Sequence, residues 1–210
     1  IAATLTALVL SFLVGPWMID RLSRYNIGQT VRTDGPESHL PKAGTPTMGG
    51  ALILVALLVP TLLWANLANI YVWVVVLATA AYGLIGLADD YLKLAKRDPR
   101  GIGAANKLGG QLLVAGGAAV ALYLVADNPA DTALSLPFIK DVLLPLGVFY
   151  IPLTMLVVVG ASNAVNLTDG LDGLAIFPAL MIAFGLGIFA YVTGHAGFSD
   201  YLNIPHVPGA

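Results

Sequence analysis

Residues 70–90 read IYVWVVVLATAAYGLIGLADD, an uncharged apolar run that ends on two adjacent aspartates. A helix needs roughly 20 mainly apolar residues to cross a lipid bilayer. This stretch therefore predicts a transmembrane helix over residues 70–89, with Asp89 and Asp90 at its end. It is the second half of a longer run without Asp, Glu, Lys or Arg, Ala43–Ala88. A polar break at Asn66–Asn69 divides that longer run into two predicted crossings joined by a tight turn.

Four further uncharged stretches extend this pattern along the chain: Ile1–Ile19, Leu108–Ala126, Val142–Thr168 and Gly173–Ser199. Hydrophobic residues make up 58% of the chain and charged residues 10%, whereas a soluble domain carries about 25% charged residues. We expect an all-α integral membrane protein, a polytopic transmembrane helix bundle that forms a single domain over residues 1–210. Six helices are predicted, at about 1–20, 46–65, 70–89, 108–126, 142–161 and 174–194.

The basic residues support this topology, because cytoplasmic loops of membrane proteins carry an excess of Lys and Arg. Only Lys140 lies in a loop predicted to face the other side. The predicted cytoplasmic loops are 21–48, 89–107 and 161–173, with both chain ends outside. The first two of these loops hold the other basic residues, which are Arg21, Arg24, Arg32, Lys42, Lys93, Lys96, Arg97, Arg100 and Lys107.

Several functions are excluded by composition. The net charge is −2 and no block of like charges occurs, so the chain lacks the basic patch that nucleic-acid binding requires. The absence of cysteine excludes disulfides, thiolate metal sites and a cysteine nucleophile. The three histidines are too far apart in sequence to suggest a zinc site.

Asp89 and Asp90 are the first candidates for chemistry. A charge at the centre of a bilayer costs about 2.5–3.5 kcal/mol on insertion scales, so both acids must lie at the membrane edge or face a wet cavity. Neighbouring side chains on a helix diverge by about 100°, which predicts different roles for the two, such as metal binding or proton transfer. The alternative is plain interfacial solvation, with Lys93 as the i,i+4 partner of Asp89.

The segment 163–173, NAVNLTDGLDG, is the second candidate, because amides and carboxylates recur in it every three residues. Such groups could bind a sugar, a base or a metal-bound phosphate, and its glycines let the backbone approach a ligand closely. A calcium loop of the EF-hand type is excluded, because the twelfth position counted from Asp169 is Leu180 rather than Glu. A polar turn without a ligand remains the alternative. Lys42 and Lys107 lie at predicted helix entries. Considered singly, each is more typical of a basic residue that anchors the cytoplasmic side of a helix.

Together, the segments 35–50, 89–91 and 163–173 closely resemble the phospho-N-acetylmuramoyl-pentapeptide transferase family, part of the polyprenyl-phosphate sugar-1-phosphate transferase superfamily. The run Gly44–Gly50 and the segment 163–173 are the specific motifs, whereas the Asp pair is shared by the whole superfamily. The resemblance implies a ten-helix enzyme of the bacterial inner membrane with its active site on the cytoplasmic side. Such an enzyme transfers phospho-MurNAc-pentapeptide from UDP-MurNAc-pentapeptide to undecaprenyl phosphate, forms lipid I in peptidoglycan biosynthesis, requires Mg²⁺ and releases UMP. A homodimer is a further expectation.

The resemblance also assigns roles to individual residues. It implies that Asp89, Asp90 and Asp169 are catalytic and that Asp89 and Asn166 contribute to metal binding. The substrate-binding residues that it implies are Lys42, Thr47, Lys107, Asn166, Gly170, Leu171 and Asp172. The family's later cytoplasmic loop, with a third catalytic aspartate, and its histidine-rich loop are not in this sequence. We therefore expect these 210 residues to be a fragment with the first six helices, inactive alone and without a main magnesium ligand.

Two mechanisms and two other functions stay open on the residues alone. An aspartate could act as a base on the lipid phosphate, or as a nucleophile in a two-step reaction. A sister transferase would pass GlcNAc-1-phosphate to the same lipid and keep the Asp pair. A cation-coupled transporter would use intramembrane acids, but near the bilayer midplane.

Depth in the membrane separates the enzyme hypotheses from the transporter. Because the chain has no cysteine, single cysteines at positions 89, 90 and 172 can be labelled without background. We expect a water-soluble maleimide added from the cytoplasmic side to label all three. Failure to label them in intact membranes, with labelling only after solubilisation, would favour the transporter.

Overall fold

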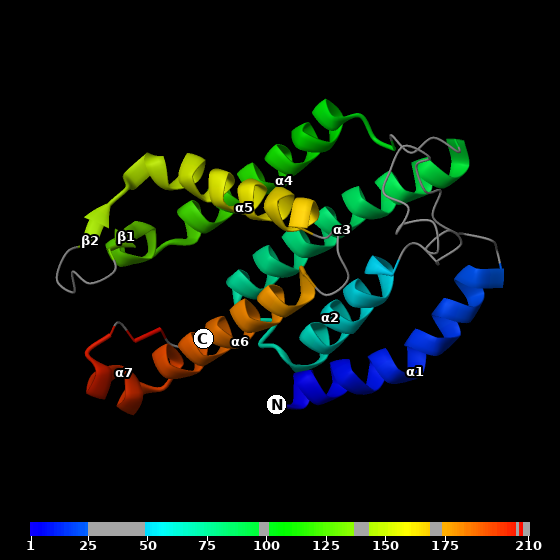
Figure 1. Ribbon diagram of the computed structural model, residues 1–210. Helices are drawn as coiled ribbons and strands as arrows, with labels where there is room; N and C mark the ends of the chain where they lie inside the picture. The colour runs from blue at the N-terminus through cyan, green and yellow to red at the C-terminus, as the bar shows by residue number, and fades with distance from the viewer. Residues whose placement is uncertain (25–48, 97–100, 137–142, 169–173, 205, 208–210) are drawn as a thin grey trace. The chain divides into compact units, whose positions relative to one another are not determined.

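The computed structural model describes residues 1–24, 49–96, 101–136, 143–168, 174–204 and 206–207 (Figure 1). The chain divides into two compact units, Ile1–Leu156 and Val157–Ala210, and each is treated by itself below. The elements in chain order are α1 (Ala2–Arg24), α2 (Gly50–Trp64), α3 (Ile70–Lys96), α4 (Ala104–Val125), η2 (Pro129–Thr132), β1 (Ala133–Ser135), β2 (Leu143–Pro145), η3 (Gly147–Phe149), α5 (Tyr150–Thr168), α6 (Ile176–Gly194) and α7 (Ala196–Leu202).

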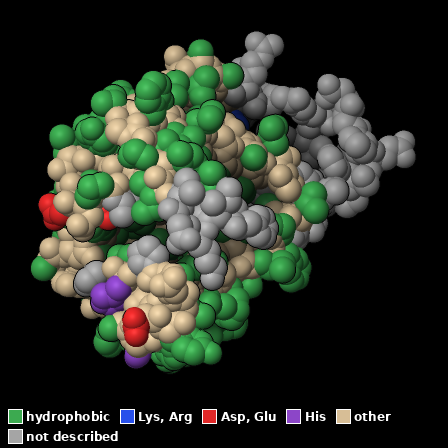
Figure 2. All heavy atoms as spheres, turned by 90° about the vertical axis from the view of Figure 1, so that its left-hand side faces the viewer, with side chains coloured by type: hydrophobic (Ala, Val, Ile, Leu, Met, Phe, Trp, Pro, Cys, Tyr) green, Lys and Arg blue, Asp and Glu red, His purple; other side chains and the backbone are tan. Residues whose placement is uncertain are grey.

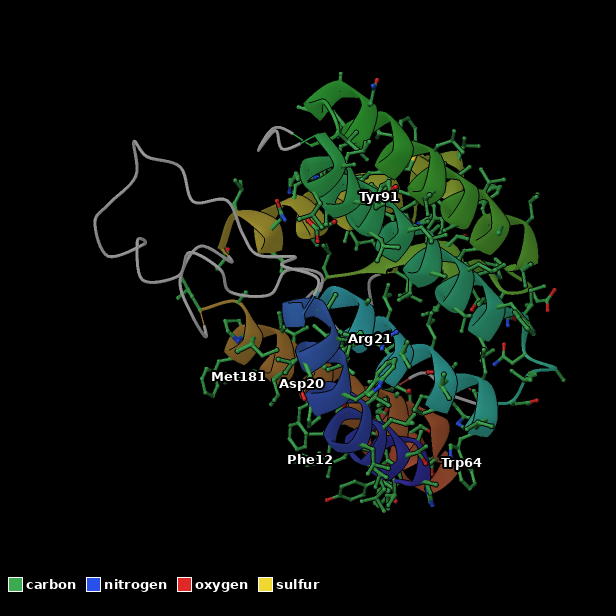
Figure 3. All side chains as sticks on the ribbon, turned by 90° about the vertical axis from the view of Figure 1, so that its right-hand side faces the viewer. Phe12, Asp20, Arg21, Trp64, Tyr91 and Met181 are labelled. Carbon is green, nitrogen blue, oxygen red and sulfur yellow. The ribbon has the colours of Figure 1, made fainter. Side chains whose placement is uncertain are left out.

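The predicted all-α membrane fold is confirmed. Among the described residues, five helices are long and apolar enough to cross a membrane, namely α1, α3, α4, α5 and α6. Helix α2 is shorter, with 15 residues. Large hydrophobic side chains such as Phe12 and Met181 are each 72% exposed and point away from their helices (Figure 3). Few charged side chains are visible on the face in Figure 2. Apolar exposure on this scale is typical of a lipid-facing surface.

Two of the predicted helices had wrong bounds. The helix predicted to end at residue 89 continues to Lys96. The charged residues can stay in the helix because the carboxylate of Asp89 pairs with the amine of Lys93, one turn later. The helix predicted over 142–161 instead runs from Tyr150 to Thr168. Its predicted first residues pair as β2 with β1. At its end, the hydroxyl of Thr168 donates to the Ala164 carbonyl at 2.8 Å, so polar residues continue the helix instead of ending it.

A short antiparallel hairpin separates α4 from α5. Ala133 lies opposite Pro145, and Ser135 lies opposite Leu143. Each of the two strands, β1 and β2, is three residues long.

Helices α1 to α4 pack as sequential neighbours in the first unit. The indole N–H of Trp64, at the end of α2, donates to the hydroxyl of Thr6 on α1 at 3.0 Å. On α4, Gln111, Ala115 and Ala119 are buried at four-residue spacing, so one stripe of mainly small residues faces the neighbouring helices. Small residues allow close helix packing where a membrane offers no hydrophobic driving force. The Tyr82 hydroxyl on α3 donates to the Gln111 carbonyl at 3.1 Å.

A tight turn makes α2 and α3 antiparallel. The side-chain oxygen of Asn69 accepts the Tyr71 N–H at 3.0 Å, an N-cap that satisfies one of the free amides at the start of α3. The indole N–H of Trp73 donates to the Leu67 carbonyl at 2.9 Å. These bonds hold the polar break of the sequence in one conformation.

Gly83 lets these two helices approach closely. A Cβ built at Gly83 would lie 2.6 Å from Leu54 Cδ2 and 3.0 Å from Leu54 Cγ, whereas a Cβ at Gly86 would meet no atom within 4 Å. The contact pairs the middle of α3 with the first turns of α2.

We predict that Gly83→Ala lowers the thermal stability of the detergent-solubilised protein by about 1–3 kcal/mol through overpacking. Gly86→Ala is the matched control, because both substitutions carry the same gain in helix propensity. Adding Leu54→Ala to Gly83→Ala should recover part of the loss. The close approach would be refuted by equal melting temperatures for the two single variants.

Candidate active site

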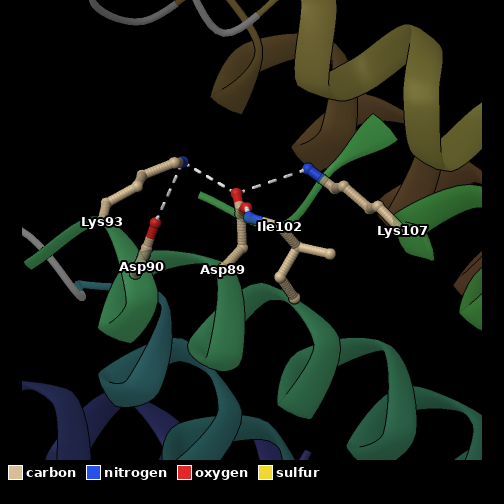
Figure 4. Close-up of polar contacts among 5 residues, drawn as sticks. All are labelled: Asp89, Asp90, Lys93, Ile102 and Lys107. Atoms are coloured by element: carbon tan, nitrogen blue, oxygen red, sulfur yellow. Dashed lines mark hydrogen bonds and ion pairs between the residues drawn. The ribbon is translucent and has the colours of Figure 1, made fainter. Parts of the chain in front are cut away.

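The last turns of α3 and the first turn of α4 bring together four charged side chains. They are Asp89, Asp90 and Lys93 on α3 and Lys107 on α4, and together they are called the Asp–Lys cluster below (Figure 4). The lysines reach Asp89 from opposite sides, and the backbone of the connection before α4 supplies a further contact at Ile102.

Asp89 is the centre of this cluster. Its Oδ1 accepts the Ile102 N–H at 2.7 Å. Its Oδ2 lies 2.7 Å from Lys93 Nζ and 3.7 Å from Lys107 Nζ. The side chain is only 9% exposed. Charge-assisted hydrogen bonds to both oxygens are what a buried carboxylate needs to remain ionised.

Asp90 has a different environment. Its Oδ1 lies 3.5 Å from Lys93 Nζ, and its side chain is 40% exposed. The sequence prediction that the two acids do not face the same way is consistent with this contrast. Asp90 keeps a solvent-accessible carboxylate, whereas Asp89 is committed to protein donors.

Both lysines form ion pairs with Asp89. Lys93 contacts both aspartates, at 2.7 Å and 3.5 Å, so the i,i+4 pair expected from the sequence is present and extends to Asp90. Lys107 is 25% exposed and lies at the longer distance from Asp89. An amine that is loosely paired and partly open to solvent can turn to a bound anion.

The second candidate segment falls partly within the described residues. Asn166 is exposed near the end of α5, in the second unit. Asn163 lies one turn earlier, and its Nδ2 donates to the Val159 carbonyl at 2.9 Å. The other predicted site residues lie outside the described residues, and their roles stay predictions: Lys42, Thr47, Asp169, Gly170, Leu171 and Asp172.

Gly101 and Ile102 were missed by the sequence analysis. Gly101 has φ +58°, and the residue after it donates the short bond to Asp89. The sequence Pro99-Arg100-Gly101-Ile102-Gly103 carries a turn signal. Nothing in that signal predicts which side chain the turn contacts.

A magnesium ion would find a partial site here. Among the described residues, no group of three or more His, Cys, Asp or Glu could hold a metal. Mg²⁺ in phosphoryl-transfer sites is bound by one or two carboxylates together with water and substrate phosphates. Asp90 fits that requirement, because its carboxylate is accessible and has one long ion pair. Asp89 fits less well, because both of its oxygens already accept donors.

Comparison with known families agrees with the motifs in the sequence. Residues 72–204 match Glycosyl transferase family 4, and residues 42–54 match the Phospho-N-acetylmuramoyl-pentapeptide-transferase signature 1. The first match covers more than half of the chain and includes the whole Asp–Lys cluster. It favours a transferase over the transporter. The chain therefore belongs to glycosyl transferase family 4, and it is a multi-pass membrane enzyme of the polyprenyl-phosphate sugar-1-phosphate transferase type.

Proposed function

We propose that this enzyme transfers phospho-MurNAc-pentapeptide from UDP-MurNAc-pentapeptide to undecaprenyl phosphate, with formation of lipid I and release of UMP. The observation that carries the proposal is the match of residues 42–54 to the signature of phospho-N-acetylmuramoyl-pentapeptide transferases. The broader family match is common to transferases with other sugars. The signature contains Thr45–Gly50, a run that a GlcNAc-1-phosphate transferase need not keep.

The described part of the signature and the Asp–Lys cluster lie at the same end of the first unit. Residues 49–54 form the start of α2, and Leu54 packs against Gly83. At 1.5 Å rise per residue, Asp89 lies about 9 Å beyond Gly83 along α3. Because α2 and α3 are antiparallel, this direction leads towards the start of α2. The shared end supports one site that includes both motifs.

We further propose that this end faces the cytoplasm of a bacterial inner membrane. The support is the concentration of Lys and Arg in the loops next to it. A water-soluble nucleotide sugar and a lipid-borne phosphate can both reach such a position. A homodimer stays a prediction.

Charge compensation is the main chemical task of the site, because the reaction joins two phosphate groups. Lys107 is the described amine best placed for this, since it is partly exposed and loosely paired. Its ammonium can contact a phosphate oxygen and stabilise charge that develops in the transition state. Lys93 is held by both aspartates and offsets part of their negative charge.

Asp90 is the residue that we propose for holding Mg²⁺, together with substrate phosphates. When bound, the ion would supply further charge compensation and orient the phosphates. The contribution of Asn166 to metal binding, expected from the resemblance, is retained as a proposal for the complete site.

Direct attack by the lipid phosphate is the mechanism that these contacts favour. A phosphate monoester has a second pKa near 6 and is largely dianionic at pH 7, so a general base gains little rate. Oδ1 of Asp89 accepts a backbone hydrogen bond and Oδ2 is paired with two lysines, which makes this carboxylate a poor nucleophile. We propose that Asp89 orients Lys93 and Lys107 rather than attacking phosphorus.

Donor choice tests the proposed function. We expect full-length protein with undecaprenyl phosphate and Mg²⁺ to release UMP from UDP-MurNAc-pentapeptide and to leave UDP-GlcNAc unreacted. Release of UMP from UDP-GlcNAc alone would support the sister transferase. Release from neither donor by well-folded protein would refute both transferase assignments.

The two aspartates should differ in their effect on the magnesium requirement. We predict that Asp90→Asn raises the Mg²⁺ concentration for half-maximal UMP release by about tenfold or more, since a ligand to the ion is weakened. Asp89→Asn should lower the turnover number strongly and leave that concentration unchanged. Asp127→Asn, at an exposed aspartate after α4, is the control and should resemble wild type. A raised Mg²⁺ requirement in the Asp89 variant alone would reverse the two roles.

A further inference from the structure

Gly101 has a backbone conformation and surroundings that admit no side chain. Its φ of +58° lies in the left-handed region, which residues with a Cβ rarely adopt. A Cβ built there would collide with Oδ1 of Asp89 and would lie 2.9 Å from Lys93 Cε and 3.0 Å from Lys93 Cγ. The backbone of the connection thus lies directly against the acid–lysine pair of α3.

This close approach makes a specific hydrogen bond possible. The N–H of Ile102, the residue after Gly101, donates to Asp89 Oδ1 at 2.7 Å. With Oδ1 held by the backbone, Oδ2 is directed to Lys93 and Lys107. A side chain at position 101 would push the carboxylate from this position and thereby move both lysines.

We propose that Gly101 is a positioning residue of the active site, because its missing side chain lets the connection before α4 fix the carboxylate of Asp89. The expected effect of Gly101 on catalysis rests on the proposed function. It does not depend on which sugar the enzyme transfers.

Gly103 provides a comparison within the same connection. It is the N-cap of α4 with φ −55°, and a Cβ there would meet no atom within 4 Å. Alanine at position 103 therefore meets neither a collision nor a strained φ, and we expect it to be tolerated there. The two positions differ in their contact with Asp89 and Lys93 and in the sign of φ.

Kinetics on full-length protein test the catalytic part. We expect Gly101→Ala to lower kcat for UMP release by about ten- to a hundredfold, as a displacement of about 1 Å in a catalytic group does. The KM for the nucleotide sugar should stay within about twofold. Gly103→Ala should retain wild-type kcat. Equal kcat values for the two variants would overturn the proposal.

A second substitution at position 101 separates the effect of the collision between the new Cβ and Asp89 from the effect of backbone strain. Asparagine adopts positive φ more readily than alanine, yet it adds the same Cβ. We therefore expect Gly101→Asn to lose kcat as Gly101→Ala does. Wild-type kcat in Gly101→Asn would mean that the conformation alone requires glycine, and it would overturn the positioning role.

Thermal stability gives a readout that needs no substrate. We expect Gly101→Ala to lower the melting temperature of the wild-type protein more than it lowers that of an Asp89→Ala variant, where the carboxylate is absent. If Gly101→Ala does not fold, recovery of folded protein in the double variant would support the contact. Equal losses in both backgrounds, or no recovery, would refute it. The outcome is independent of the donor test, so failure of the proposed function and failure of this inference can be told apart.

Discussion

A buried carboxylate constrains the first unit of this protein more than any other described group. Asp89 follows an apolar helix without a charged residue from Ile70 to Ala88, and its own side chain is almost fully covered. Removing such a charge from water is costly unless ion pairs and hydrogen bonds replace the lost hydration. Here the replacements come from the same helix, from the next connection and from the next helix. The end of α3 and the start of α4 are therefore tied to one another through a single side chain.

This constraint also explains the contrast between the two aspartates. A helix turns by about 100° per residue, so Asp90 faces another direction and shares one partner of Asp89, Lys93, at the longer distance of 3.5 Å. It is left with one long ion pair and an accessible carboxylate. Asp89 holds the two lysines, and the carboxylate of Asp90 remains accessible to a ligand. This difference between the two acids follows from helix geometry.

The sequence was sufficient for the fold class and for the approximate position of most helices. Uncharged runs of bilayer length predicted α3, α4 and α6, and the Asn66–Asn69 break predicted the turn before α3. The boundaries at Lys96 and Thr168 were missed, because a helix continues through polar residues whenever their side chains find partners. Lys93 beside Asp89 and the hydroxyl of Thr168 on a backbone carbonyl are such cases.

The candidate site was predicted in part for a related reason. Asp89, Asp90 and Lys107 could be selected from their positions at the ends of apolar runs and from the family resemblance. Gly101 could not, because its role depends on a contact between the connection and α3 that has no local signature. The positive φ of Gly101 and its lack of a Cβ indicate a positioning role only when the neighbouring atom is known to be Asp89 Oδ1.

The position of the cluster along its helices fits the chemistry of a membrane-bound transferase. The penalty for charge is greatest at the centre of the bilayer and falls towards the interface, where long lysine side chains can extend their amines to water. Lys93 and Lys107 are 37% and 25% exposed, although each contacts the buried Asp89. In the proposed topology, the cations would link a buried acid to the aqueous edge, which is also the depth at which the phosphate of a membrane-anchored lipid lies. A nucleotide sugar approaching from water and a phosphate carried by lipid would therefore meet the same amines without either substrate having to leave its own phase.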